Sequence, residues 1–93
     1  MKSLIHHLLG ETRTALLATL LLRPEQSLHV RELVRLTGAS PGTLHRELQA
    51  LVRHGVLQRR QVGRQVFYQA NPACAVLPEL TGLVRKTAGL VAT

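Results

Sequence analysis

The 93-residue sequence contains no tryptophan and no aspartate, and only one each of phenylalanine, tyrosine and cysteine. Modules that bind single-stranded nucleic acid by stacking need several exposed aromatic rings, and two do not suffice. The single Cys74 excludes an internal disulfide and fits a reducing compartment. Without aspartate, the paired carboxylates of a magnesium-dependent transferase are missing, and no P-loop, dinucleotide-binding or nucleophile-elbow pattern occurs. We therefore expect a protein that is not an enzyme.

Long hydrophobic runs are missing as well. The longest, residues 15–22, is interrupted by Thr19 and is far too short to span a bilayer. Near the N-terminus, polar residues and a glycine interrupt any signal-like apolar stretch. We expect a cytoplasmic protein with no membrane partner.

What the sequence does contain is arginine. Twelve Lys and Arg face five acidic residues, all Glu, for a net charge of +7, and ten of the twelve cations are Arg. Eight of the ten Arg lie between Arg23 and Tyr68. Arginine makes bidentate contacts with phosphate and with guanine edges. Positive charge alone indicates an acidic partner, which could be nucleic acid, membrane or protein, so the interpretation depends on where the arginines lie.

Periodicity and turn residues predict one domain over residues 1–93, mainly α-helical with a small β-hairpin. Gly38 ends one predicted helix, and Ser40-Pro41 has the cap-plus-proline pattern that begins the next. Gly63-Arg64 is a plausible hairpin turn. The predicted segments are an N-terminal helical region 1–22, an extended piece 28–30, a helix-turn-helix 30–55 with helices 30–37 and 41–54, strands 57–62 and 65–70, and a final helix 72–92 opened by Asn71-Pro72.

The helix-turn-helix is the candidate functional unit. Its second helix begins with small residues, which let the free N–H groups approach a phosphate closely. Polar side chains then follow at helical spacing on the face away from the leucines, and this arrangement suits base edges in a major groove. The hairpin after it is rich in arginine, as expected of a wing that reaches phosphates or a minor groove. The predicted DNA-binding residues are Ser40, Gly42, Thr43, His45, Arg46 and Gln49 on the helix, and Arg59, Arg60 and Arg64 on the wing.

ArsR-like bacterial and archaeal regulators have winged helices that resemble the run LHVRELVRLTGASPGTLHRELQALVRHGVLQRRQVGRQVFYQANP, and the resemblance covers residues 10–72. Within that group the chain is most similar to winged helices that carry SPGT and a following NP…PEL…LVRKT stretch. Such domains often precede a nucleotidyltransferase domain. The resemblance implies a homodimer formed by the first and last helices, with the second helix of the motif in the major groove.

Two departures from that family bear on ligands. The first helix of the motif, HVRELVRLTG, lacks the paired cysteines of metal-sensing members, and residues 73–93 hold no His and only Glu79. His6, His7, Glu11 and Cys74 show no spacing typical of a zinc site. We therefore expect no metal and no cofactor. The nucleotidyltransferase domain is also absent from the 93 residues.

Two functions remain open. The first is sequence-specific binding of double-stranded DNA by a small dimeric transcription regulator. The second is a protein-interaction winged helix, whose partner could be a separately encoded nucleotidyltransferase. The dimer is also expected because the chain has more apolar stripe than one small core can cover; this stripe comprises Leu16, Leu20, Leu80, Leu83 and Leu90. Three further expectations concern single residues: His29 partly caps a helix, Tyr68 belongs to the core at the base of the wing, and Cys74 is buried.

Overall fold

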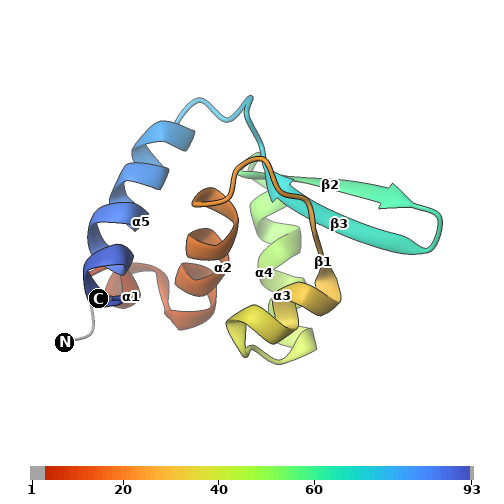
Figure 1. Ribbon diagram of the computed structural model, residues 1–93, viewed down its shortest axis with the longest axis horizontal. Coiled ribbons are helices and arrows are strands. Elements are labelled where there is room, and N and C mark those ends of the chain that lie inside the picture. The colour runs from red at the N-terminus through yellow and green to blue at the C-terminus, as the bar shows by residue number, and fades with distance from the viewer. Residues whose placement is uncertain (1–3, 93) are drawn as a thin grey trace.

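A computed structural model describes the backbone of residues 4–92 and the side chains of residues 6–86. Its elements follow the predicted order of helices, short strand, helix-turn-helix, hairpin and final helix (Figure 1). They are α1 (Leu4–Leu9), α2 (Glu11–Leu21), β1 (Leu28–His29), α3 (Val30–Thr37), α4 (Pro41–Arg53), β2 (Leu57–Val62), β3 (Gln65–Ala70) and α5 (Leu77–Ala92). The three strands form one antiparallel sheet in the order β1-β3-β2. The mainly helical class with a small hairpin is confirmed.

The turn between α3 and α4 forms where the sequence predicts it. Gly38 adopts a left-handed conformation with φ of 71°, which is unfavourable for other residues, and its N–H donates to the Val34 carbonyl at 3.0 Å. Ser40 caps α4 by accepting a hydrogen bond from the Thr43 N–H at 3.4 Å, and Pro41 follows in the first turn. These local signals fix how the two helices of the motif are joined.

At the start of α3 a histidine takes the place of the usual Ser or Thr cap. The His29 Nδ1 atom accepts a hydrogen bond from the Arg31 N–H at 3.0 Å. The ring also meets Phe67 edge-on, with centroids 5.6 Å apart. The expected capping role of His29 is confirmed.

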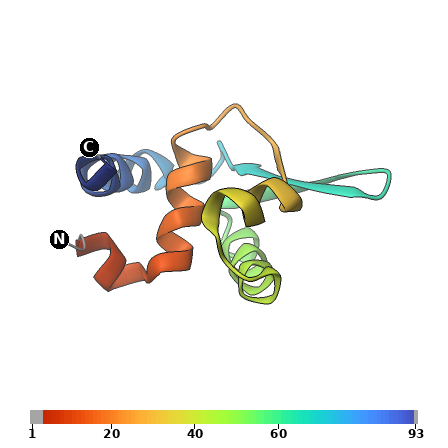
Figure 2. The same ribbon diagram turned by 60° about the horizontal axis from the view of Figure 1, so that its bottom comes forward.

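The core is aliphatic and is centred on α2. This helix lies between α5 on one side and the α3–α4 pair on the other (Figures 1 and 2). It buries Leu16, Leu17, Leu20 and Leu21 in the centre of the molecule. The remaining buried apolar side chains are Leu33, Leu44, Leu48, Leu51, Leu57, Tyr68, Ala70 and Val84. Tyr68 is 3% exposed, so its predicted place at the base of the wing is confirmed.

The prediction of a final helix over residues 72–92 is wrong at its start, because α5 begins at Leu77. The Asn71 side chain accepts a hydrogen bond from the Ala73 N–H at 3.0 Å and donates one to the Gly55 carbonyl at 2.8 Å. These bonds hold a turn against the end of α4 instead of capping a helix. Pro78 then occupies the first turn of α5, where its missing N–H costs nothing. Cys74, in the same segment, is half-buried rather than buried.

Part of the reasoning for a dimer is also wrong. Leu16 and Leu20 are both 0% exposed within a single chain, because α5 and the α3–α4 pair cover α2, so neither is available to a second copy. Leu80 is half-buried and Leu83 is 37% exposed, while the Leu90 side chain lies outside those described.

No helix within residues 4–92 is long and apolar enough to cross a membrane.

Candidate nucleic-acid interface

The outer face of α4 carries the row of polar side chains that the sequence predicts. His45, Arg46 and Gln49 are exposed and Thr43 is half-buried. The opposite face of the helix packs Leu44, Leu48 and Leu51 into the core. The apolar side therefore fixes α4 to the domain and leaves its polar side open along the whole helix.

The first turn of α4 also organises its outer face. The Ser40 hydroxyl donates to Thr43 Oγ1 at 3.0 Å, and Arg46 Nη2 donates to the same oxygen at 3.4 Å. The chain of bonds joins the cap of α4 to Arg46 and holds that guanidinium beside the helix start. Gly42, which lies between Ser40 and Thr43 in the sequence, is exposed. Apart from its own chain neighbours and the backbone of its helix, no atom lies within 4 Å of the point where a Cβ would be. The start of the helix is thus accessible to a bulky anion.

Glu47, the one carboxylate of α4, is paired with α2 and takes no part in the bonds around Arg46. Arg13 of α2 donates to it twice, from Nε at 2.7 Å and from Nη2 at 3.2 Å. The hydrogen bond to Glu47 raises the pKa of Arg13 above its ordinary value, and the nearby negative charge adds to that effect. Arg13 thus neutralises the only negative charge on α4 that could repel phosphate. Sequence reasoning did not find this pair, because 34 residues separate its members.

The hairpin carries arginines on both faces of its ribbon and in its turn. Arg59 is paired with Tyr68 across the ladder, and Arg60 with Phe67. Because successive side chains of a strand point to opposite faces, Arg59 shares the face of the buried Tyr68 and Arg60 points to the other. Arg64 follows Gly63, whose φ is 61°, in the turn. All three arginines thus lie on the predicted wing, and Arg59 and Arg60 both line a hollow of about 220 Å³.

A groove of about 460 Å³ lies between α4 and the hairpin. Its lining residues are His45, Gln49, Val52, Arg53, Arg59 and Tyr68. Arg53 and Arg59 both line it, and none of the carboxylates within residues 6–86 does. Arg53 is absent from the residues predicted to bind DNA, although it lies one turn after Gln49 and continues the polar row of α4. That helical spacing is the signal that could have identified it.

Potential metal ligands do not gather in the described part of the chain. Among its His, Cys and Glu residues no group of three could hold one ion. His45 lies among arginines in the groove, and His29 uses its Nδ1 atom to cap α3.

Comparisons with known proteins agree with this geometry. Residues 7–61 match the model of a family described as the IclR helix-turn-helix domain. Reduced HlyU from Vibrio cholerae has a similar structure, with a TM-score of 0.69 and 24% sequence identity over 89% of this chain and 82% of that one. So does AdcR, a zinc-dependent MarR family transcriptional regulator in its Zn(II)-bound state, with a TM-score of 0.57 and 23% identity over 90% of this chain and 57% of that one. No curated protein sequence matches the chain significantly. The predicted winged helix-turn-helix fold is confirmed.

Proposed function

The chain belongs to the IclR helix-turn-helix domain family, and from that premise we propose that it binds double-stranded DNA as a transcription regulator. The observation that carries the proposal is the groove between α4 and the hairpin, which Arg53 and Arg59 line and which no carboxylate of residues 6–86 lines. A phosphodiester backbone is the partner whose charge and elongated shape suit this surface.

In the proposed complex α4 lies in the major groove. The accessible start of the helix, from Ser40 to Thr43, faces a phosphate, and Arg46 reaches a base edge one turn further on. His45 and Gln49 supply further hydrogen-bonding groups on the same face. Arg53 and Arg59, which line the protein groove between α4 and the hairpin, bind the DNA backbone next to the major groove. In this division the outer face of α4 recognises bases, and Arg53 and Arg59 position the protein on the phosphates.

A homodimer is part of the proposal, formed through α1 and α5. These helices lie side by side on the face away from the hairpin (Figures 1 and 2). Leu8 of α1 is 60% exposed and Leu83 of α5 is 37% exposed, so apolar surface is available there. A two-fold dimer would place its two α4 helices on half-sites about one DNA turn, roughly 34 Å, apart. Leu8→Glu is expected to yield a monomer in sedimentation measurements, and a wild-type chain that sediments as a monomer at micromolar concentration contradicts the dimer.

The resemblance to ArsR-like regulators stays a prediction, and so do the individual DNA contacts. The experiment that tests them starts from a duplex selected from random sequences by the wild-type protein. Arg46→Ala should lower affinity for the selected duplex by roughly 1–3 kcal/mol and relax the preference at one position per half-site. Arg64→Ala should weaken binding to selected and random duplexes alike and reduce the salt dependence.

The pattern of failure identifies which part is wrong. If Arg46→Ala lowers the affinity for the selected duplex and for a random duplex equally, α4 does not read bases. If the wild-type protein binds no duplex at all at low salt, DNA binding is refuted. The alternative of a winged helix that serves a protein partner, such as a separately encoded nucleotidyltransferase, would then take its place.

A further inference from the structure

The groove between α4 and the hairpin has features that the proposed DNA contacts do not use. Its two least exposed lining residues are Tyr68, which is 3% exposed, and the half-buried Val52. A phosphate bound by the arginines above them gains nothing from such an apolar base. The groove holds about 460 Å³, and pockets for small organic molecules typically hold about 300–1,000 Å³. Its size and its apolar base therefore fit a small ligand.

The hydroxyl of Tyr68 has no hydrogen-bond partner among residues 6–86. In that part of the chain, no side-chain oxygen or nitrogen is both enclosed and without a partner. The hydroxyl therefore opens onto the groove that Tyr68 lines and does not end inside the core. Buried tyrosines usually satisfy this O–H with a partner. A ligand in the groove would supply one.

Cationic and polar groups stand on both sides of that hydroxyl. Arg59 lies directly opposite Tyr68 in the ladder, where the Cβ atoms of paired residues are about 4.5–5.5 Å apart. On α4, the groove residues His45, Gln49 and Arg53 follow one another at intervals of one helical turn. Neither arginine has a carboxylate partner within residues 6–86. Both guanidinium groups are thus available to an anion.

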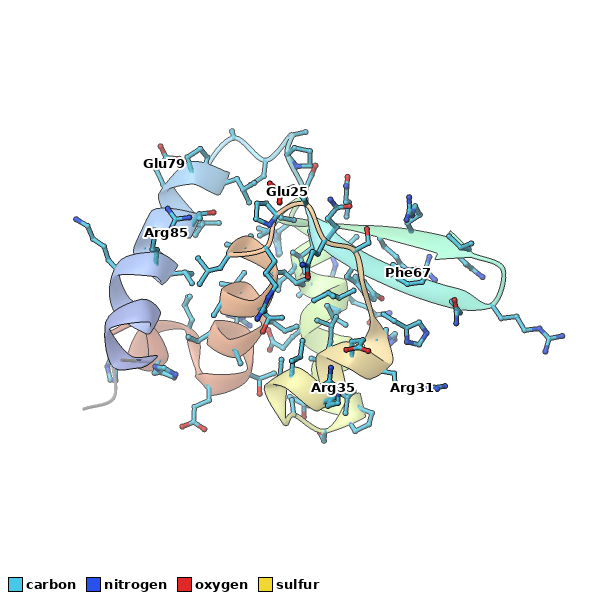
Figure 3. All side chains as sticks on the ribbon, in the orientation of Figure 1. Glu25, Arg31, Arg35, Phe67, Glu79 and Arg85 are labelled. Atoms are coloured by element: carbon cyan, nitrogen blue, oxygen red, sulfur yellow. The ribbon has the colours of Figure 1, made fainter. Side chains whose placement is uncertain are left out.

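Acidic side chains that could oppose an anion lie elsewhere. Arg13 binds Glu47, and Glu79 lies at the start of α5, across the molecule from the hairpin (Figure 3). Phe67, which Figure 3 marks on β3, precedes Tyr68 and so belongs to the other face of the ribbon. The groove combines two guanidinium groups, a phenol O–H and an apolar base, and this set matches a small organic acid.

We propose that the groove binds a small organic acid with an apolar ring, and that this ligand and DNA exclude each other. The carboxylate lies between Arg53 and Arg59 and accepts a hydrogen bond from Tyr68, while the ring packs against Val52. The guanidinium fork matches the planar geometry of a carboxylate. The inference rests on the proposed function, because the same two arginines bind the DNA backbone there. It adds a site through which a small molecule releases the protein from DNA.

The first test is calorimetric titration of the full chain with 2-naphthoate. We expect one molecule per protomer with a Kd of about 1 mM or lower, as is usual for a ligand of this size. The uncharged 2-naphthamide and the ringless acetate should each bind at least about tenfold more weakly, because each lacks one half of the recognised chemistry.

Two variants locate the site. Tyr68→Phe removes only the hydroxyl and should weaken 2-naphthoate binding about tenfold, while the affinity for the selected duplex stays at the wild-type value. Gln65→Ala, at an exposed position on the other face of the ribbon, is the control and should bind 2-naphthoate as the wild type does. If Tyr68→Phe unfolds at a lower temperature than the wild type, Arg53→Gln at its exposed position should show the same loss of 2-naphthoate binding.

The second test measures competition on the selected duplex at constant ionic strength. With 2-naphthoate at ten times its wild-type Kd, the apparent Kd for DNA should rise about tenfold for the wild type and only about twofold for Tyr68→Phe. Acetate at the same concentration should have no effect.

Three results would overturn the inference and leave DNA binding intact: no saturable binding of 2-naphthoate up to about 10 mM, equal binding by the wild type, Tyr68→Phe and Arg53→Gln, or binding that leaves DNA affinity unchanged. If the wild-type protein binds 2-naphthoate through Tyr68 but binds no duplex, the proposed function fails and the ligand site stands.

Discussion

The ion pair between Arg13 and Glu47 should stabilise the fold by fixing α4 on α2. Its two bonds, of 2.7 and 3.2 Å, form a fork in which the side chains are 40% and 23% exposed. Exposed ion pairs contribute about 0.2–1 kcal/mol, and bidentate geometry strengthens them. For this half-exposed pair we expect a coupling energy of about 1 kcal/mol, which corresponds to a fall of about 4–8 °C in Tm for a domain of this size.

A double-mutant cycle measures that coupling, with Arg13→Gln, Glu47→Gln and the double variant unfolded by heat and by urea. Arg13→Gln should destabilise more than Glu47→Gln, because it leaves the less exposed charge without a partner. Since the pair raises the pKa of Arg13, the stability linked to the Arg13 proton is fully present below the unfolded pKa and is lost as the pH rises through the higher folded pKa, at strongly alkaline pH. A coupling below about 0.3 kcal/mol would refute the reasoning and show that the leucines alone anchor α4.

Three further predictions concern single residues and metals. His29→Ala should cost about 1 kcal/mol of unfolding free energy and His29→Asn much less, because asparagine can also cap α3; equal losses in urea unfolding would contradict the capping role. Leu48→Ala should cost about 2–5 kcal/mol because the side chain is fully buried, whereas Leu36→Ala, a matched change at a 43% exposed position, should stay within about 0.5 kcal/mol. Zinc, cadmium or arsenite should change DNA affinity less than tenfold, about 1.4 kcal/mol of coupling, and a larger change in a titration would reveal a metal site.

The parts of the fold that could be predicted from the sequence are those set by residues close together in the chain. Gly38 and Ser40-Pro41 are complete turn and cap signals within a few residues, so the helix-turn-helix could be located from the sequence. The hairpin strands, 57–62 and 65–70, were likewise predicted at their observed bounds from β-forming residues around a Gly turn. Helices and hairpins of this kind are set mainly by neighbours in sequence.

Features that depend on distant contacts could not be predicted in the same way. Asn71-Pro72 carries a helix-start signal, but the Asn71 side chain bonds to Gly55 and its neighbour Ala73 instead. Nothing local pairs Arg13 with Glu47. The opposite orientations of Arg59 and Arg60, by contrast, follow from the period-two pattern of a strand once Leu57 is taken as buried.

The most direct test of DNA binding is the salt dependence of wild-type affinity for the selected duplex. If Arg53, Arg59 and Arg64 each bind a phosphate in both protomers of a dimer, log Kobs should fall against log salt with a slope of about −5, at about −0.9 for each contact. A slope near zero, or no duplex binding at about 50 mM salt, would contradict the claim that these arginines form a DNA interface.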